Sequence, residues 1–290
     1  MVKLSIAILN YSAGDFLLNC LKSLSQVEKE VSSEVYILDN ASADGSFEEA
    51  KKKFPKFNYI QNFENLGFGK GYNVFLKNLK TEYVLLLNPD SELKKDTLRY
   101  MVEYMDLNPM VGASSCKVVK QDGTLDWASH RGFPTPLASF LYFFFKNDSL
   151  YHLTNRDFSK PHEVDSIVGA FFLTRKSVLE KVGLFDPEYF MYGEDLDLCF
   201  RIKKAGFKVM YVPGVEVLHH KGISSGIKKH SKEASQADKA SKTRAFNAFY
   251  EAMLIFYKKN LSKSYPFFLN WLVYIGINMK WSLAKKKMSV

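Results

Sequence analysis

The chain of 290 residues is 47% hydrophobic, which is enough for one large α/β domain, or two small ones, with a packed core. Its three cysteines (Cys20, Cys116 and Cys199) are scattered without C-x-x-C spacing, which argues against a disulfide framework or a structural zinc site and favours a reducing compartment. The net charge of +9 is uneven, because residues 221–290 hold 14 Lys and Arg against 3 Asp and Glu; this indicates an anionic partner such as lipid headgroups, nucleic acid or a phosphorylated substrate.

The first third of the chain alternates apolar strands with helices. Hydrophobic spacing predicts strands at 4–9, 34–38, 57–61 and 83–87, and helices at 16–24, 47–53 and 69–79. This order indicates a parallel sheet covered by helices on both faces. The first residues form a buried strand in this interpretation, with no long apolar run typical of a signal peptide, so we expect a cytoplasmic protein.

Polar residues follow three of these strands, at the edge where open α/β sheets bind ligands. They are Asn10-Tyr11-Ser12, Asp39-Asn40 and Asn88-Pro89-Asp90. Asp39 and Asp90 directly end strongly apolar strands, so both are expected at the same sheet edge. A carboxylate there can accept hydrogen bonds from a nucleobase or ribose, or bind a metal. Asp44, before Gly45, is interpreted as a turn residue leading into the next helix.

Glycines at 67, 69 and 71 superficially match a dinucleotide-binding loop. That fingerprint requires glycines directly after the first strand of a βαβ unit, whereas these lie beyond the third strand. A Rossmann oxidoreductase is therefore not expected. Close packing of the following helix, or close approach of the backbone to a sugar nucleotide, explains the glycines better.

A cluster of acids begins a helix that is expected from about Glu194 to Gly206. Glu194, Asp195 and Asp197 could simply stabilise the first turn through the helix dipole, or one of them could serve as a general base. A further strand at 215–218 ends at His219 and His220. Adjacent strand residues point to opposite faces, so at most one of these histidines can reach the cleft as a metal ligand.

Taken in order, these stretches resemble glycosyltransferase family 2, in particular its bacterial rhamnosyltransferase-like branch. The resemblance spans residues 4 to about 225 and rests on SIAILNY at 5–11, ILDNAS at 37–42, NLGFGKGYN at 65–73, LLNPD at 86–90, VGAFFL at 168–173, GLFD at 183–186, GEDLD at 193–197 and HHKG at 219–222. It implies a GT-A fold, a mixed sheet flanked by helices. A nucleotide-sugar-binding half (1–110) and an acceptor-binding half (111–225) would be followed by a basic, aromatic-rich helical tail (226–290).

The resemblance also implies roles for individual residues. Asp90 takes the place of the metal-binding D-x-D motif, whose first carboxylate is replaced by Asn88, and would hold Mg²⁺ or Mn²⁺ together with His219. Asp195 is the expected base, supported by Glu194 and Asp197. Gly169 and Ala170 lie on the acceptor side. The donor-binding set is Asn10, Tyr11, Asp39, Asn40, Gly67, Gly71, Asn73, Asn88 and Asp90.

The implied reaction is an inverting transfer of a sugar from a nucleotide-diphosphate donor to a glycan or a polyprenyl-diphosphate-linked acceptor in cell-surface polysaccharide synthesis, with dTDP-rhamnose favoured as the donor. A nucleotidyltransferase should carry a basic Gly-rich loop after its first strand, and residues 10–15 contain no Lys or Arg. A non-catalytic sugar-nucleotide-binding protein has no reason to keep Asp39, Asp90 and Asp195 together. Nucleic-acid binding lacks a recognisable module.

The tail favours a membrane surface. Between Lys263 and Lys280 lie 16 uncharged residues, fewer than the ~20 that span a bilayer. We expect a helix in the interface at the inner face of the membrane, anchored by aromatic residues, Lys280 and the lysines at 285–287. A helical hairpin packed on the catalytic domain is the alternative. The aromatic cluster at 140–145 could join the same face or line an acceptor entrance.

Overall fold

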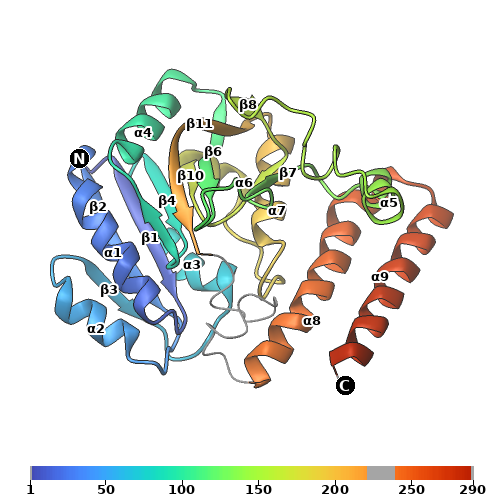
Figure 1. Ribbon diagram of the computed structural model, residues 1–290, viewed down its shortest axis with the longest axis horizontal. Coiled ribbons are helices and arrows are strands. Elements are labelled where there is room, and N and C mark those ends of the chain that lie inside the picture. Colours follow the sequence, from blue (N-terminus) through green and yellow to red (C-terminus); the bar gives the residue numbers. More distant parts are fainter. Residues whose placement is uncertain (1, 221–238, 289–290) are drawn as a thin grey trace.

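The computed structural model describes residues 2–220 and 239–288, and its centre is a nine-stranded mixed sheet of order β3-β2-β1-β4-β10-β6-β11-β5, with β8 paired to β11 (Figure 1). The first half of the chain supplies the four strands at one edge of the sheet, β3, β2, β1 and β4, and also β5 at the opposite edge. Its elements are β1 (Leu4–Asn10), α1 (Asp15–Val27), η1 (Glu28–Glu30), β2 (Ser33–Asp39), α2 (Ser46–Lys53), β3 (Asn58–Gln61), α3 (Phe68–Leu76), β4 (Tyr83–Leu87), β5 (Ser91–Leu93) and α4 (Thr97–Leu107).

Strands β3, β2, β1 and β4 are parallel, as the sequence predicts. Asn10 pairs with Asp39, and Ile8 pairs with both Ile37 and Leu87, so these strands end together at one edge. Alternate residues serve opposite faces of the sheet. In β1, Ile6 and Ile8 pack with α1, α2 and α4, whereas Ala7 and Leu9 pack with α3, α6 and α7. Two buried cores therefore hold the sheet edge in place.

The second half of the chain makes the sheet mixed. Its elements are β6 (Val111–Val119), β7 (His130–Arg131), α5 (Pro136–Phe145), β8 (His162–Glu163), β9 (Ser166–Ile167), β10 (Phe172–Arg175), α6 (Lys176–Val182), α7 (Glu194–Lys204) and β11 (Lys208–His219). Strand β10 runs antiparallel between β4 and β6, and β7 pairs with β9 in a small second sheet. The mixed sheet of the expected GT-A fold is present.

Strand β11 is much longer than the segment predicted at 215–218. It runs from Lys208 to His219 because an irregularity between Val212 and Glu216 accommodates Pro213, Gly214 and Val215 without ending the strand. Gly214 lies against the ring of Tyr100, where an added Cβ would come within 2.3 Å of Tyr100 Cζ. The strand thus continues to His219 at the functional edge.

Helix α8 (Lys239–Phe256) leads through η3 (Tyr257–Leu261) and η4 (Ser262–Ser264) to α9 (Phe267–Met288). Figure 1 shows α8 and α9 side by side, with α5 at one end of the pair. Ala252, Phe256 and Leu261 pack with Tyr189 and Leu196 of the sheet domain. This is the packing that the hairpin alternative expects for α8. The domain boundary expected near residue 225, and Lys221-Gly222 of the last motif, lie outside the described residues.

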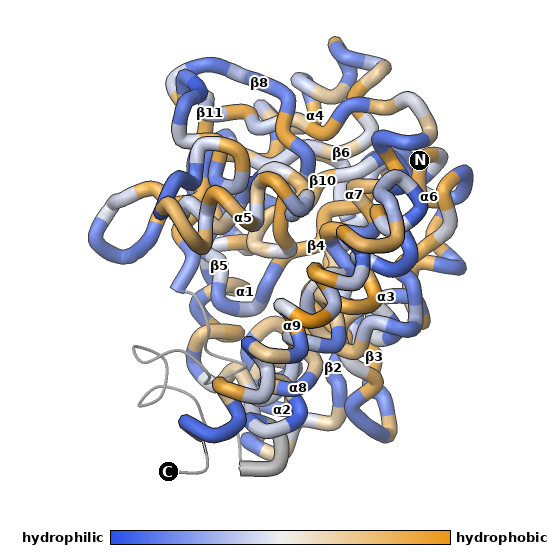
Figure 2. The backbone as a smooth tube through the Cα atoms, turned by 90° about the vertical axis from the view of Figure 1, so that its right-hand side faces the viewer, coloured by the Kyte–Doolittle hydropathy of each residue, from blue (hydrophilic) through white to orange (hydrophobic). Residues whose placement is uncertain are grey.

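Helix α9 contacts α8 through the stacked rings of Tyr250 and Trp281, whose centroids are 5.9 Å apart. It also meets α5, where the ammonium of Lys280 lies 3.4 Å from the ring centroid of Phe143. Figure 2 shows hydrophobic stretches of α5 and α9 on one side of the molecule. Within residues 2–220 and 239–288, no helix combines the length and apolarity that crossing a membrane requires.

Candidate active site

Asp39 ends β2 and is fully buried, and its carboxylate is held by a local hydrogen-bond network. Oδ1 accepts from Asn10 Nδ2 at 2.9 Å and from Ser42 Oγ at 2.6 Å, while Oδ2 accepts from the Ser42 backbone N–H at 2.9 Å. Asn10 is itself fully buried at the end of β1, and Tyr11 lies half-buried in the bend that follows. Asn10 therefore holds the carboxylate of Asp39 in place. The sequence alone gave Asn10 only as one member of the expected donor-binding set.

Asn40 connects the end of β2 to the glycine-containing turn before α3. Its Nδ2 donates to Gly67 O at 2.9 Å, and its Oδ1 accepts from Asn62 Nδ2 at 2.9 Å. Gly67 has φ = +79°, and an added Cβ there would come within 2.2 Å of Phe190 O. Asn40 thus connects the end of β2 to the turn that precedes α3, and both belong to the expected donor-binding half.

Gly71 and Asn73 have packing roles on α3. An added Cβ at Gly71 would lie 2.9 Å from Leu9 Cδ1, so the glycine allows α3 to lie close to β1. Asn73 Nδ2 donates to Phe185 O at 2.8 Å, and its Oδ1 accepts from the Phe185 backbone N–H at 3.1 Å. Close packing, one of the two interpretations offered for these glycines, is what the structure displays.

Asp90 and His219 face each other where β4 and β11 end. Asp90 Oδ1 is 3.2 Å from His219 Nε2, and Asn88 Nδ2 is 3.4 Å from the same nitrogen. Both residues are buried. Burial raises the pKa of Asp90, but the charge and hydrogen bond of His219, with smaller contributions from the backbone and His220, together outweigh burial, so the net shift is downward. Burial lowers the pKa of His219, but Asp90 and Asp126 together raise it to about 9.

The two adjacent histidines separate as strand geometry requires. His220 points away from the site, where its Nε2 lies 2.7 Å from Glu92 Oε1 and its Nδ1 lies 2.6 Å from Gln121 Nε2. The sequence left open which histidine lies beside Asp90. The structure places His219 there.

This pair is chemically suited to a divalent cation. A carboxylate oxygen and an imidazole nitrogen are ligands that Mn²⁺ accepts, and Mg²⁺ is usually held by one or two carboxylates plus substrate phosphates. His219 Nδ1 is turned toward Asp126 Oδ2 at 3.6 Å, so Nε2, beside Asp90, is the ring nitrogen that a cation would use after displacing its proton. Among the described residues, no three or more His, Cys, Asp or Glu side chains form a complete metal cage. A cation here would complete its shell with phosphate oxygens or water.

Glu194 and Asp195 form a buried acidic pair in the first turn of α7. Asp195 Oδ1 accepts from the Leu196 backbone N–H at 2.7 Å, and Arg131 Nη2 lies 3.8 Å from Asp195 Oδ2. Burial and the charge of Asp195 raise the pKa of Glu194 to about 8. Burial also raises the pKa of Asp195, and Arg131 opposes that shift without reversing it. Because the two buried carboxyl groups are adjacent, ionisation of one opposes ionisation of the other, and Arg131 favours placing the charge on Asp195.

Asp197, the third acid, is fully engaged in structural contacts. Its Oδ2 accepts from Arg201 Nε at 2.8 Å, and its Oδ1 accepts from Asn260 Nδ2 at 2.8 Å. Asp197 thus anchors the C-terminal region to α7. Of the three acids considered as the general base, Glu194 and Asp195 therefore remain the candidates.

Gly169 and Ala170 support the end of β4. Gly169 O accepts from the Asn88 backbone N–H at 2.8 Å, and Ala170 O accepts from Ser91 Oγ at 2.9 Å. An added Cβ at Gly169 would lie 2.9 Å from Asn88 Oδ1. Both residues therefore hold the turn that carries Asp90, and their place on the acceptor side, which the resemblance implies, stays a prediction.

Two residues of this site were missed by the sequence analysis. Asp126 Oδ2 lies 3.6 Å from His219 Nδ1, and Arg131 contacts Asp195. Asp126 and Arg131 lie at the two ends of one short segment that follows β6. This segment therefore contacts both the Asp90–His219 pair and the acidic pair. No apolar periodicity or motif marks this segment in the sequence.

Comparison with known proteins gives one consistent picture. A family profile described as "Glycosyltransferase like family 2" matches residues 3–241. An N-acetylglucosaminyl-diphospho-decaprenol L-rhamnosyltransferase of Mycobacterium tuberculosis is 30% identical over 77% of this chain and 78% of its own. The rhamnosyltransferase WbbL of Escherichia coli is 31% identical over 53% of this chain and 61% of its own.

A solved structure of similar fold is a mannosyltransferase from Pyrobaculum calidifontis in complex with GDP-Man and Mn²⁺. It superimposes with a TM-score of 0.55 at 16% identity, covering 96% of this chain and 80% of that one. The likeness establishes the GT-A architecture.

Proposed function

The chain belongs to the family 2-like glycosyltransferases, and we propose that it transfers rhamnose, with inversion, from a nucleotide-diphosphate donor to a polyprenyl-diphosphate-linked acceptor. The sugar and the acceptor are inferred from the similarity to the rhamnosyltransferase of Mycobacterium tuberculosis, and the observation that carries the chemical step is the acidic pair, where Arg131 faces Asp195 and the neighbouring Glu194 has a pKa of about 8. An ionised carboxylate beside a protonated one is suited to accept a proton from an acceptor hydroxyl.

The donor would lie along the edge formed by β1, β2 and β4. Asp39, fixed by Asn10 and Ser42, is proposed to accept hydrogen bonds from the nucleobase, with Tyr11 and Asn40 beside it. Gly67, Gly71 and Asn73 shape the wall behind this edge through their packing contacts. Asn88 and Asp90 would receive the diphosphate at the end of β4.

Mg²⁺ or Mn²⁺ would be held by Asp90 and His219. When bound, such a cation neutralises the charge that develops on the departing diphosphate. The Mn²⁺ in the mannosyltransferase of similar fold supports this choice. Asn88, 3.4 Å from His219 Nε2, would orient the histidine and the diphosphate.

The chemical step follows from the charge state of the acidic pair. The acceptor oxygen attacks the anomeric carbon as the bond from that carbon to the diphosphate oxygen breaks, and the hydroxyl proton passes to Asp195. Glu194 stays protonated, which prevents two adjacent negative charges in a buried site. Direct displacement by a single nucleophile inverts the anomeric centre.

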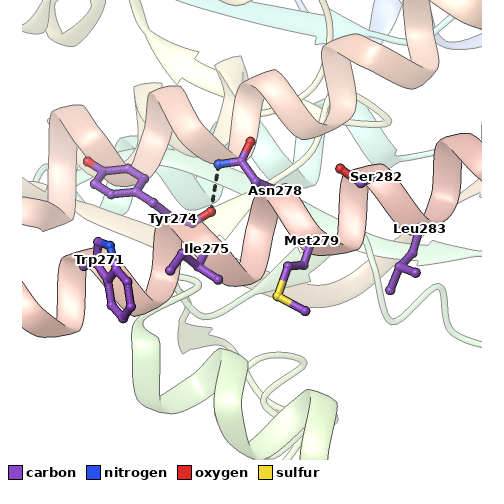
Figure 3. Close-up of a pocket in the computed structure, with 7 residues that line it drawn as sticks. All are labelled: Trp271, Tyr274, Ile275, Asn278, Met279, Ser282 and Leu283. Atoms are coloured by element: carbon purple, nitrogen blue, oxygen red, sulfur yellow. Dashed lines mark hydrogen bonds between the residues drawn. The ribbon is translucent and has the colours of Figure 1, made fainter.

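The protein is proposed to work on the inner face of a membrane, where a lipid-linked acceptor would be available. Exposed aromatic side chains gather on α5 and α9, among them Phe143, Phe144, Phe268 and Trp271. Figure 3 shows Trp271, Ile275, Met279 and Leu283 on one side of α9. Helix α9 contains Lys280 and the lysines at 285–287 but no acidic residue, which complements anionic lipid headgroups.

The test is a donor screen with purified full-length protein. Saturation binding of dTDP-rhamnose, UDP-glucose, UDP-N-acetylglucosamine and GDP-mannose is measured with Mn²⁺ present, followed by transfer to a short polyprenyl-diphosphate-linked N-acetylglucosamine. We expect dTDP-rhamnose to bind tightest and to give an inverted product. Preferred binding of another donor would refute the choice of rhamnose. A nucleotide product released without sugar transfer to any lipid acceptor would refute the acceptor.

A further inference from the structure

Asp126 is a buried carboxylate for which the proposed reaction assigns no role. Its side chain is 3% exposed, and its backbone is held on both sides, because its N–H donates to Val118 O at 2.9 Å and its C=O accepts from the Ser129 N–H at 2.9 Å. Of its two carboxylate oxygens, Oδ1 accepts from the Ala128 N–H at 3.1 Å. This hydrogen bond is typical of a turn residue, and an asparagine side chain could accept it equally well.

The second oxygen faces the site. Asp126 Oδ2 lies 3.6 Å from Nδ1 of His219, while Nε2 on the other side of the ring lies 3.2 Å from Asp90 Oδ1. The imidazole is therefore placed between two buried carboxylates, one at each nitrogen. Nδ1 is buried and makes no hydrogen bond within the described part of the chain, so Asp126 Oδ2 is positioned to receive its proton.

We propose that Asp126 is a positioning residue that keeps the proton of His219 on Nδ1 and thereby presents the Nε2 lone pair to the divalent cation beside Asp90. This inference rests on the proposed function, since it assumes a cation at the Asp90–His219 pair. Histidines that bind metals commonly donate their other ring N–H to a carboxylate, and losing that partner typically lowers metal affinity about 10–100-fold.

The Asp126→Asn variant changes the contact with His219 without disturbing the turn. The amide oxygen can still accept from the Ala128 N–H, so the turn is preserved. The amide NH₂ would then face His219 Nδ1 and favour the tautomer in which Nδ1 accepts and Nε2 carries the proton. A protonated Nε2 cannot bind a metal. Asp122→Asn is the matched control, because Asp122 is an exposed acid in the same loop that caps Thr124.

The experiment titrates Mn²⁺ into the full-length protein, in the presence of saturating dTDP, and follows free Mn²⁺ by electron paramagnetic resonance. We expect Asp126→Asn to weaken Mn²⁺ binding about 10–100-fold and Asp122→Asn to leave it unchanged. Binding of dTDP without metal should be the same in all three proteins. Equal Mn²⁺ affinity in wild type and Asp126→Asn would overturn the role of Asp126 while leaving the metal site standing.

Failure of the wild type to bind Mn²⁺ would instead refute the metal site itself, and the role of Asp126 with it. A measurement that needs no variant is the ¹⁵N resonance of His219 in the wild-type protein with Mg²⁺ and dTDP. We expect a protonated Nδ1 and an unprotonated Nε2. The opposite tautomer would overturn the inference even if Asp126→Asn failed to fold.

Discussion

Arg131 and Asp195 meet across two elements that are far apart in the sequence, with Arg131 Nη2 3.8 Å from Asp195 Oδ2. Arg131 comes from β7, and Asp195 lies in the first turn of α7. The guanidinium favours the charged form of Asp195, with which it makes the ion pair, whereas burial and the charge of Asp195 raise the pKa of the adjacent Glu194 to about 8. Of the two neighbouring acids, Asp195 is therefore the one that its surroundings favour in the charged form.

The first prediction concerns turnover. Asp195→Asn removes the carboxylate that is proposed to accept the proton of the acceptor hydroxyl, so kcat should fall by at least ~10²-fold. Binding of the donor should be largely intact, because Asp195 lies on α7 and the donor edge is formed by β1, β2 and β4. Steady-state kinetics and donor titrations measure the two effects separately. Turnover close to that of the wild type would remove Asp195 from the role of base.

The second prediction concerns stability and pH. The pKa of Glu194 is about 8 in the folded protein and near 4.5 when the chain is unfolded, so between these values the folded state binds more protons. Stability therefore falls as pH rises through this window. Glu194→Gln cannot ionise, and its melting temperature should exceed that of the wild type by at least ~2 °C at pH 9, a shift that corresponds to roughly 1 kcal/mol.

At pH 4.5 the melting temperatures of the two proteins should differ least, because Glu194 is then protonated in the folded state and about half protonated in the unfolded state. Thermal unfolding at half-unit steps from pH 4.5 to 9 measures the trend. A difference in melting temperature that does not grow with pH would show that Glu194 ionises normally in the folded protein.

Much of the fold and part of the site could be predicted because they depend on local signals. The apolar strands that precede Asp39 and Asp90 bury both faces, so their ends and the parallel edge were identifiable. The GEDLD stretch begins a helix for the reason expected, since acids favour the first turn. Local pattern could not distinguish the three acids of this stretch as candidates for the base, because Glu194, Asp195 and Asp197 differ only in their distant partners.

Those partners are set by tertiary contacts. Arg131 reaches Asp195, and Asn260 reaches Asp197 across 63 positions of the chain. The segment from Asp126 to Arg131 has neither strand alternation nor helical spacing over a useful length, so its position between the two halves of the site is decided by the pairing of β7 with β9. Hydrophobic periodicity likewise does not predict the contact between α5 and α9 at Phe143 and Lys280.

A third prediction follows from the charge of Arg131. Arg131→Gln removes the cation that opposes the upward shift of the Asp195 pKa. The acid limb of the pH profile of kcat/KM should therefore move to higher pH, because Asp195 must be ionised to act as a base. Arg131→Lys retains a positive charge and should leave the limb closer to that of the wild type. An unshifted limb in Arg131→Gln would show that Arg131 does not influence the group that titrates.

A fourth prediction tests how the C-terminal region is attached. Asn260→Ala removes the amide that donates to Asp197 Oδ1 at 2.8 Å and leaves a buried carboxylate oxygen without that partner. The free energy of unfolding should fall by about 1–3 kcal/mol. Urea denaturation of the full-length protein measures the change. Asn278→Ala is the matched control, because Asn278 is an exposed α9 residue whose amide bonds only the Tyr274 carbonyl; a loss as large as that of Asn260→Ala would contradict the argument.

The last prediction concerns the membrane surface. Replacing the lysines at 285–287 by Ala removes three positive charges from the end of α9, each worth ~1 kcal/mol next to an anionic bilayer, so the partition coefficient should fall roughly 10²-fold. The matched control replaces Lys51, Lys52 and Lys53, three consecutive lysines that end α2 on the sheet domain. Co-sedimentation with vesicles of phosphatidylglycerol measures both variants.

Binding of the wild-type protein to these vesicles should also weaken as salt rises, because exposed charges are screened beyond ~10 Å at 0.1 M ionic strength. Equal losses in the two triple variants would mean that net charge alone, and not α9, determines binding. Undiminished binding of the 285–287 variant to anionic vesicles would exclude these lysines from the membrane contact.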